Sequence, residues 1–314
     1  MILFGTTKQG EDVHAVTLSG HGLSATVLTL GAIVQDVRLD GIDRSLTVGS
    51  DRLADYEGDL CYHGAIVGPV ANRISGGTAT INGFEHQLER NFVGKHTLHS
   101  GERGLHTRVW SVEDQTDNSL TLALSVPNGD FGLPGNRTFT GKFSITQGPA
   151  LTLSITSTTD ENTFVNATNH SYWCLGDTGT MAGHTLRIDA ETYLPTTDEA
   201  LPTGEVAEVA GTGFDFRTTT PLTLGMTPYD NTFVAARARR ALTPVLTLAT
   251  DAIEMTVATT EPGVHIYDDR PNYGAIAVEC QGWPDAPAHP HFPSILLTPD
   301  APVTQTTRWT FARR

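Results

Sequence analysis

Short segments in which apolar and polar residues alternate recur along the whole chain. They span residues 24–30, 120–126, 151–156, 245–250, 253–258 and 275–279. A period of two places successive side chains on opposite faces of a β-strand, and each segment has the length of an ordinary strand. Helical periodicity is nearly absent, and only short helical turns are predicted, at 52–56 and 234–240. The pattern therefore predicts an all-β fold.

The residues between these segments favour antiparallel pairing. Asn, Asp, Gly and Pro gather at 118–119, 127–130 and 269–272, where they favour tight turns between neighbouring strands. Parallel strands need long crossover connections, usually helical, and the sequence predicts no such helices. We expect a large, mostly antiparallel sandwich or barrel, because the alternation fits either architecture. No linker-like composition divides the chain, so a single domain over 1–314 is expected.

Acidic side chains outnumber basic ones, 35 to 20, which gives a formal net charge of −15. Such a chain repels nucleic acid at long range, so nucleic acid is not an expected partner. The lysines are Lys8, Lys95 and Lys142, and the arginines are scattered outside 237–240. This distribution disfavours a phosphorylated substrate.

The N-terminal residues and the cysteines bear on the compartment. The first residues lack the basic region and apolar stretch of a secretory signal, and no apolar run is long enough to span a bilayer. Cys61, Cys174 and Cys280 are well separated and form neither a disulfide framework nor a zinc knuckle. We expect a cytoplasmic protein with reduced thiols and no membrane segment.

One histidine and one glutamate are candidates for proton transfer. His170 lies among hydroxyl and amide side chains that could fix its tautomer, and imidazole gains or loses a proton near neutral pH. Glu279 lies between Val278 and Cys280 in a strand-like run. It is a surface residue if those two point inward, and a buried carboxylate if the strand is buried on both faces. Burial raises the pKa of a carboxyl group and makes it a stronger base.

Other polar residues fit ligand binding more readily than metal binding. His96 and His99 share a Gly-bounded loop, and His289 and His291 form a second pair, but neither spacing matches a zinc motif. Loop histidines that hydrogen-bond a ligand are the favoured interpretation. Arg73 and Asp230 lie in turn-like segments, where each is either a solvated charge or part of a clamp on sugar hydroxyls.

Several short motifs follow one another along the chain. They lie at 68–74 (Gly-Pro-Val-Ala-Asn-Arg-Ile), 98–101 (Leu-His-Ser-Gly), 166–173 (Asn-Ala-Thr-Asn-His-Ser-Tyr-Trp), 201–205 (Leu-Pro-Thr-Gly-Glu), 230–233 (Asp-Asn-Thr-Phe), 259–264 (Thr-Thr-Glu-Pro-Gly-Val), 279–286 (Glu-Cys-Gln-Gly-Trp-Pro-Asp-Ala) and 292–294 (Phe-Pro-Ser). In this order the motifs resemble those of the aldose 1-epimerase, or galactose mutarotase, family. No motif is specific alone, but the match covers nearly the whole chain.

The resemblance implies a galactose mutarotase-like β-supersandwich with few short helices. It implies an isomerase that interconverts the α and β anomers of free aldohexoses such as galactose or glucose, with a monosaccharide as its partner and no metal or redox cofactor. Glu279 is implied as the general base and His170 as the general acid. The implied sugar-binding residues are Arg73, His99, Asp230, Asn72 and His265. A monomer or a homodimer is compatible with this reading.

Two other functions remain open on the sequence. A hexose-phosphate 1-epimerase would need a basic cluster at the rim of the pocket, and a non-catalytic sugar-binding protein would use the same pocket without turnover. The chain also departs from the family pattern, which leaves the preferred sugar unassigned. The departures are Pro69, Cys174, Glu261, His265, Gly282, Ala288, His289 and His291.

Overall fold

Antiparallel β-sheet makes up nearly all of the regular structure in the computed structural model, which describes residues 1–225 and 227–314. The first sheet contains β1 (Ile2–Thr6), β2 (Asp12–Gly20), β3 (Leu23–Leu28) and β4 (Ile33–Leu39), in that order. The largest sheet has the order β10 (Ser111–Gln115), β11 (Ser119–Val126), β12 (Arg137–Thr146), β13 (Ala150–Thr159), β27 (Val303–Arg313), β23 (Ile253–Thr259), β22 (Thr243–Ala249), β17 (Thr185–Ile188) and β20 (Thr220–Pro221).

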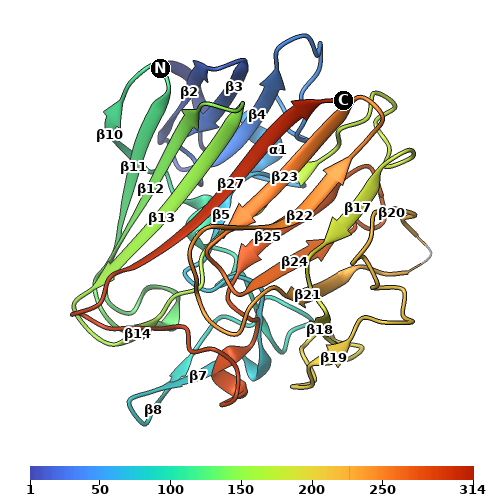
Figure 1. The fold of residues 1–314 in the computed structure, drawn as a ribbon. Helices are drawn as coiled ribbons and strands as arrows, with labels where there is room; N and C mark the ends of the chain where they lie inside the picture. Colours follow the sequence, from blue (N-terminus) through green and yellow to red (C-terminus); the bar gives the residue numbers. More distant parts are fainter. Residues whose placement is uncertain (226) are drawn as a thin grey trace.

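A third sheet carries much of the functional site. Its order is β16 (Tyr172–Trp173), β25 (Ile276–Gln281), β24 (Gly263–Tyr267), β21 (Asp230–Val234), β18 (Thr192–Leu194) and β19 (Ala207–Glu208). Four short pairs complete the strands: β5 (Ile66–Val67) with β15 (Thr168–Asn169), β6 (Arg73–Ile74) with β9 (Thr97–Leu98), β7 (Thr78–Ile81) with β8 (Phe84–Gln87), and β14 (Thr163–Phe164) with β26 (Leu296–Leu297). Figure 1 shows β27 in the middle of the largest sheet, between the green strands β11–β13 and the orange strands β23 and β22.

Apolar side chains between the sheets form the core of a sandwich. Trp173 of β16 contacts Trp309 and Phe311 of β27, with ring centroids 5.7 Å apart in both pairs. These rings join the third sheet to the largest one, and all three are nearly inaccessible to solvent. Truncating a buried Trp or Phe typically destabilises a protein by about 3–5 kcal/mol, so the contact fixes one sheet against the other.

The alternating segments lie on strands β3, β11, β13, β22, β23 and β25, which confirms the all-β prediction. Of the two predicted helical turns, that at 52–56 is present as α1 (Leu53–Tyr56). The turn predicted at 234–240 is wrong. Val234 ends β21, and the N–H groups of Ala235 and Ala236 both donate to the carbonyl of Pro262 instead of to their own segment. No helix in the described residues is long and apolar enough to cross a bilayer.

Candidate active site

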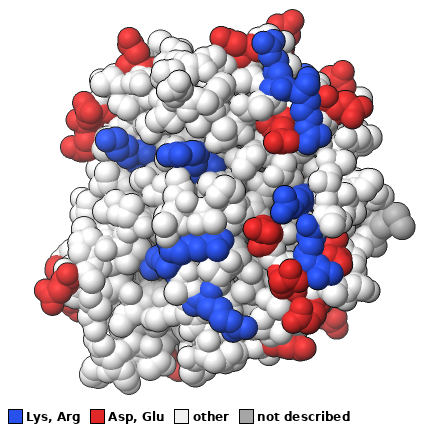
Figure 2. Space-filling model, viewed as in Figure 1, with Lys and Arg blue, Asp and Glu red and all other residues white. Residues whose placement is uncertain are grey.

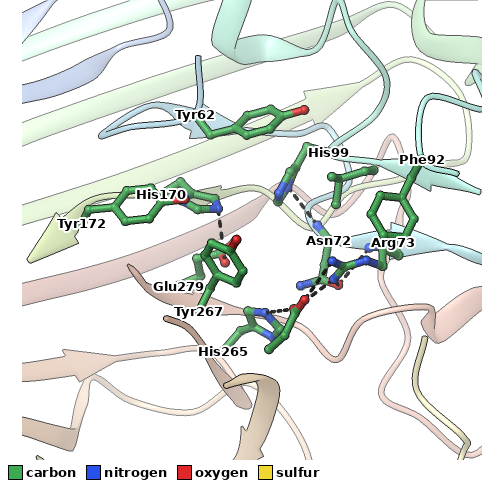
Figure 3. Close-up of a pocket in the computed structure, with 12 residues that line it drawn as sticks. Tyr62, Asn72, Arg73, Phe92, His99, His170, Tyr172, His265, Tyr267 and Glu279 are labelled. Atoms are coloured by element: carbon green, nitrogen blue, oxygen red, sulfur yellow. Dashed lines mark hydrogen bonds and ion pairs between the residues drawn. The ribbon is translucent and has the colours of Figure 1, made fainter. Parts of the chain in front are cut away.

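A cavity of about 220 Å³ lies beside the third sheet, and its walls come from several distant segments of the chain. All seven residues that the resemblance implies for the site line it: Asn72, Arg73, His99, His170, Asp230, His265 and Glu279. Tyr62, Phe92, Leu98, Tyr172 and Tyr267 complete the lining (Figure 3). The volume is below that of a typical drug-sized pocket, which matches a ligand of about one sugar ring.

Three neighbouring strands, β25, β24 and β21, form the wall of the cavity that carries Glu279 and His265. Glu279 on β25 is directly opposite His265 on β24, and His265 is directly opposite Thr232 on β21. Every residue of β25 is buried, including Val278 and Cys280, and Glu279 is only 1% exposed. Of the two alternatives for Glu279, the structure therefore selects the carboxylate on a strand buried on both faces.

His170 is held by the backbone bonds of the segment between β15 and β16. Its N–H donates to the carbonyl of Ala65, and its carbonyl accepts from the N–H of Gly64. The adjacent Asn169 amide donates to the Gly64 carbonyl and accepts from the Ser171 N–H. The idea that the polar neighbours fix the imidazole directly is wrong, because Asn169 binds backbone and Nδ1 of His170 has no hydrogen-bond partner in the described part of the chain.

The imidazole of His170 faces the carboxylate of Glu279 across the cavity wall. Nε2 of His170 is 3.5 Å from Oε1 of Glu279, and both side chains are nearly fully buried (Figure 3). This separation exceeds that of a strong hydrogen bond, so the two groups are not tied to one another and each can also bond a ligand atom that lies beside them in the cavity. An imidazole and a carboxylate thus meet in one buried part of the cavity.

His99 is a neutral hydrogen-bond donor. Its Nδ1 accepts the backbone N–H of Asn72 at 3.1 Å, which leaves Nε2 as the protonated nitrogen. Burial, with further repulsion from His170, holds the pKa of His99 well below its usual value. Asn72, His99 and Ser100 have left-handed φ angles of 62°, 50° and 65°. The Ser100 hydroxyl bonds the backbone N–H and carbonyl of Val70, and so joins the segment at 99–100 to the one at 70–72. Backbone strain of this kind gathers at functional sites.

The tautomer of His99 also bears on whether a group of three side chains could bind a metal ion. Ligand atoms of His99, His170 and Glu279 lie within 4.8 Å of one another. A metal needs a nitrogen lone pair, but one nitrogen of His99 accepts a hydrogen bond and the other carries the proton. His99 therefore lacks the free lone pair that a metal ligand needs.

Asp230 is fully engaged by cationic and polar neighbours. Arg73 binds it through both terminal nitrogens at 3.0 and 2.9 Å, and His265 and Arg270 contact it at 3.1 and 3.4 Å. These contacts occupy the roughly four acceptor positions of a carboxylate. Burial acts to raise the pKa of Asp230, but the His265 hydrogen bond and the Arg73 charge outweigh it and hold the pKa well below its usual range. Asp230 thus remains ionised and anchors Arg73, which lies 4.6 Å from the Phe92 ring.

Both ring nitrogens of His265 are engaged by the protein. Nε2 meets the ionised Asp230 and therefore carries a proton, and Nδ1 accepts from the Thr232 hydroxyl at 3.0 Å. His265 lines the cavity through its ring, while His96, His289 and His291 are not among the lining residues. His96 binds Glu199 and the Gly76 N–H, and His291 meets the Gly204 carbonyl.

Four residues at the site carry no signal in the sequence alone. Tyr62, Phe92 and Tyr267 are lining residues, and Arg270 contacts Asp230 from the connection between β24 and β25. Aromatic and apolar residues of this kind are usually core residues, so composition and spacing do not single them out. Their place is set by which loops the sandwich brings together.

The fold is a β-sandwich with a histidine and a glutamate paired at its cavity. A family model described as aldose 1-epimerase matches residues 14–310. The chain is 30% identical to the galactose mutarotase of Bos taurus over 99% of this chain and 97% of that protein, and 28% identical to the aldose 1-epimerase of Escherichia coli K12 over 96% of each. The structure of an aldose epimerase homologue from C. elegans matches with a TM-score of 0.90 and 27% identity, over 96% of this chain and 99% of that one.

This chain belongs to the aldose 1-epimerase family. The family is one of isomerases that act on carbohydrates, and the galactose mutarotase-like fold implied by the sequence motifs is confirmed.

Three neutral histidines around the site predict acid-dependent stability. Burial, assisted by the nearby His170, lowers the pKa of His63 to about 3 and that of His106 to about 4, and the pKa of His99 is also lowered. In the unfolded chain these imidazoles protonate near pH 6.5, about the usual histidine value. Between that pH and the folded-state values the unfolded chain binds more protons, so stability should fall as the pH falls.

We expect the substitution His63→Phe to weaken this pH dependence. His63 stacks on Tyr172 at 3.9 Å, and Phe keeps a stacked ring without the titrating nitrogen. For each pH unit below 6.5, the unfolding free energy of the variant should then fall by up to about 1.4 kcal/mol less than that of the wild type. Urea unfolding at pH 7 and pH 5 measures both slopes. Equal slopes in the two proteins would contradict the neutral state of His63.

Proposed function

We propose that this chain is an aldose 1-epimerase that interconverts the α and β anomers of free aldohexoses such as galactose or glucose. The observation that carries the proposal is the contact between His170 and Glu279, 3.5 Å apart in a cavity the size of one sugar ring. Membership of the family supports the same chemistry.

The reaction needs two proton transfers that these side chains can perform. The Glu279 carboxylate takes the proton of the anomeric hydroxyl while protonated His170 gives a proton to the ring oxygen. The bond between C1 and the ring oxygen then breaks, and the open aldehyde turns about C1–C2. Reclosure on the other face returns both protons to their starting residues. General acid and base catalysis typically contributes about 10²–10⁴-fold, and fixed orientation of the reactants contributes more.

The remaining side chains orient the ring. His99 offers its Nε2–H, and Asn72 and Arg73 lie beside it, where they can bind sugar oxygens. We propose these three, with Asp230 and His265 supporting Arg73, as the substrate-binding set. Tyr267 and Phe92 give the cavity apolar walls of the kind on which a sugar ring packs. Proton transfer of this kind requires no metal and no redox cofactor.

The charges around the cavity favour a free sugar over a sugar phosphate. Among the described lining residues the only Lys or Arg is Arg73, and Asp230 neutralises it. Arg270 is paired with Asp268 as well as Asp230. Basic side chains on the face shown in Figure 2 form separate small groups with acidic ones among them. A dianionic phosphate would therefore meet no unpaired cation in the described part of the pocket.

The proposal extends to the domain organisation, the compartment and the partners of the protein. We propose a single domain over residues 1–314 that acts in the cytoplasm on a monosaccharide, as a monomer or a homodimer. Its net charge of −15 argues against nucleic acid as a partner.

Polarimetry on free and phosphorylated sugars tests the proposed substrate class. Freshly dissolved α-D-galactose and α-D-glucose should relax to anomeric equilibrium faster with the protein than in buffer, and glucose 6-phosphate should be accelerated at least about tenfold less. Equal or greater acceleration of the phosphorylated sugar would favour the hexose-phosphate 1-epimerase instead. Bovine serum albumin at the same concentration controls for non-specific effects.

A further inference from the structure

A general-acid histidine is usually oriented by a hydrogen bond to its second nitrogen. His170 lacks this bond within the described residues, because its Nδ1 is buried without a partner. Nε2 of His170 lies toward Glu279. Contacts with the faces and edges of neighbouring rings are the other means by which the protein can hold the ring plane.

Aromatic rings enclose His170 on several sides. Tyr62 stacks on it with ring centroids 5.9 Å apart and planes 27° from parallel, and Tyr172 lies 5.1 Å away at 31°. His99 meets it edge-on at 5.2 Å. In Figure 3 Tyr62 lies on one side of His170, and Glu279 and Tyr267 lie on the other. Stacked and edge-on aromatic pairs favour particular ring orientations, so this enclosure can fix the imidazole.

The two tyrosines are themselves supported by histidines. Tyr172 stacks on His63 at 3.9 Å and 13°, and Tyr62 contacts His106 and His99 with centroids 4.8 Å away in each case. His63 and His106 stay neutral at neutral pH, because burial lowers their pKa values to about 3 and about 4. Burial also raises the pKa of both tyrosines above the usual value, so no charge is added next to His170.

We propose that Tyr62 is a positioning residue that holds the His170 imidazole against Tyr172 by ring stacking, in place of a hydrogen bond to Nδ1. This inference rests on the proposed function for its effect on rate. The imidazole presents its Nε2–H to the cavity, because Nδ1 has no acceptor among the described residues and Nε2 faces the Glu279 carboxylate. Loss of the Tyr62 ring leaves the imidazole free to tilt away from the ring oxygen of the sugar.

The matched pair Tyr62→Leu and Tyr62→Phe tests the stacking role. Phe keeps the ring and removes only the hydroxyl, so Tyr62→Phe should retain kcat within about threefold of the wild type. Tyr62→Leu should lower kcat by about 10- to 100-fold, more than it raises KM, because a small misplacement of a catalytic group has effects of this size. A Phe variant as slow as the Leu variant would assign the role to the hydroxyl and overturn the proposal.

Nitrogen-15 NMR of the histidine rings gives a readout that needs no turnover. The His170 signals, assigned by their loss in His170→Gln, should show one Nε2–H tautomer in the wild type and in Tyr62→Phe at a pH where the ring is neutral. In Tyr62→Leu they should broaden or move toward mixed-tautomer values. Unchanged His170 signals in Tyr62→Leu would overturn the proposal, even if the wild type proved to have no mutarotase activity.

Discussion

Replacing Glu279 by Gln should lower kcat for galactose mutarotation by about 10²–10⁴-fold, the usual range for a lost general base. Gln has nearly the same shape but cannot accept a proton from the anomeric hydroxyl at neutral pH. The buried β25 and the wall of the cavity should remain in place, so the sugar should still bind. Polarimetry gives the rate, and isothermal titration with galactose gives the affinity.

A second buried glutamate provides the matched control. Glu261 is fully buried, binds Arg239 and Gln305, and lies outside the cavity lining. Burial raises the pKa of Glu261, although Arg239 opposes the effect. The substitution Glu261→Gln removes a buried carboxylate of the same kind and should change stability with kcat within about threefold of the wild type. Similar losses of rate in both variants would mean that Glu279 has no particular role as the base.

Replacing His170 by Gln should also lower kcat by about 10²–10⁴-fold, because the proton donor to the ring oxygen is removed. The Gln amide can occupy the space near Nε2 but does not transfer a proton at neutral pH. Sugar affinity should change far less than the rate, since Asn72, Arg73 and His99 remain. The two effects are separated by measuring kcat and KM over a range of galactose concentrations.

The control for this variant is another buried histidine. His96 is 2% exposed, bonds Glu199 and the Gly76 N–H, and does not line the cavity. His96→Gln keeps a donor and an acceptor at that position and should retain most of the activity. Because His170 and Glu279 act on one reaction step, the double variant should be little slower than either single variant. Additive losses would contradict their action as a pair.

The strands were predictable from sequence because one physical pattern dominates them. Alternation marked β11, β13 and β23, which have one face in the core, and it also found β25, although that strand is buried on both faces. The pattern does not show which sheets pack together. The contact of Trp173 with Trp309 joins residues far apart in the chain, and no local signal predicts it.

The helical turn predicted after Val234 shows where local propensity fails. The run of Ala and Arg from 235 to 240 favours helix in isolation. In the folded chain the Pro262 carbonyl, in the bend just before β24, accepts hydrogen bonds from two of its N–H groups, and this tertiary contact outweighs the local preference. Intrinsic helix preferences are below about 1 kcal/mol per residue, so such bonds readily outweigh them.

The resemblance named residues that the structure brings together, but it did not predict their contacts. All seven implied residues line one cavity, and the sequence did not show that Asp230 is held by Arg73, His265 and Arg270. Arg270 comes from the connection between β24 and β25, where sequence indicates only a turn. The aromatic enclosure of His170 was also hidden, because Tyr62 approaches it from a loop more than 100 residues away in sequence.

The most direct test of the account is the approach to anomeric equilibrium from both sides. Pure α-D-galactose and pure β-D-galactose are dissolved separately with protein at a thousandfold lower concentration than sugar, and optical rotation is followed. The account predicts that both samples reach the buffer equilibrium, with the same increased rate constant that rises linearly with protein concentration. Relaxation no faster than in buffer from either anomer would show that the protein does not interconvert the anomers, and would contradict the account.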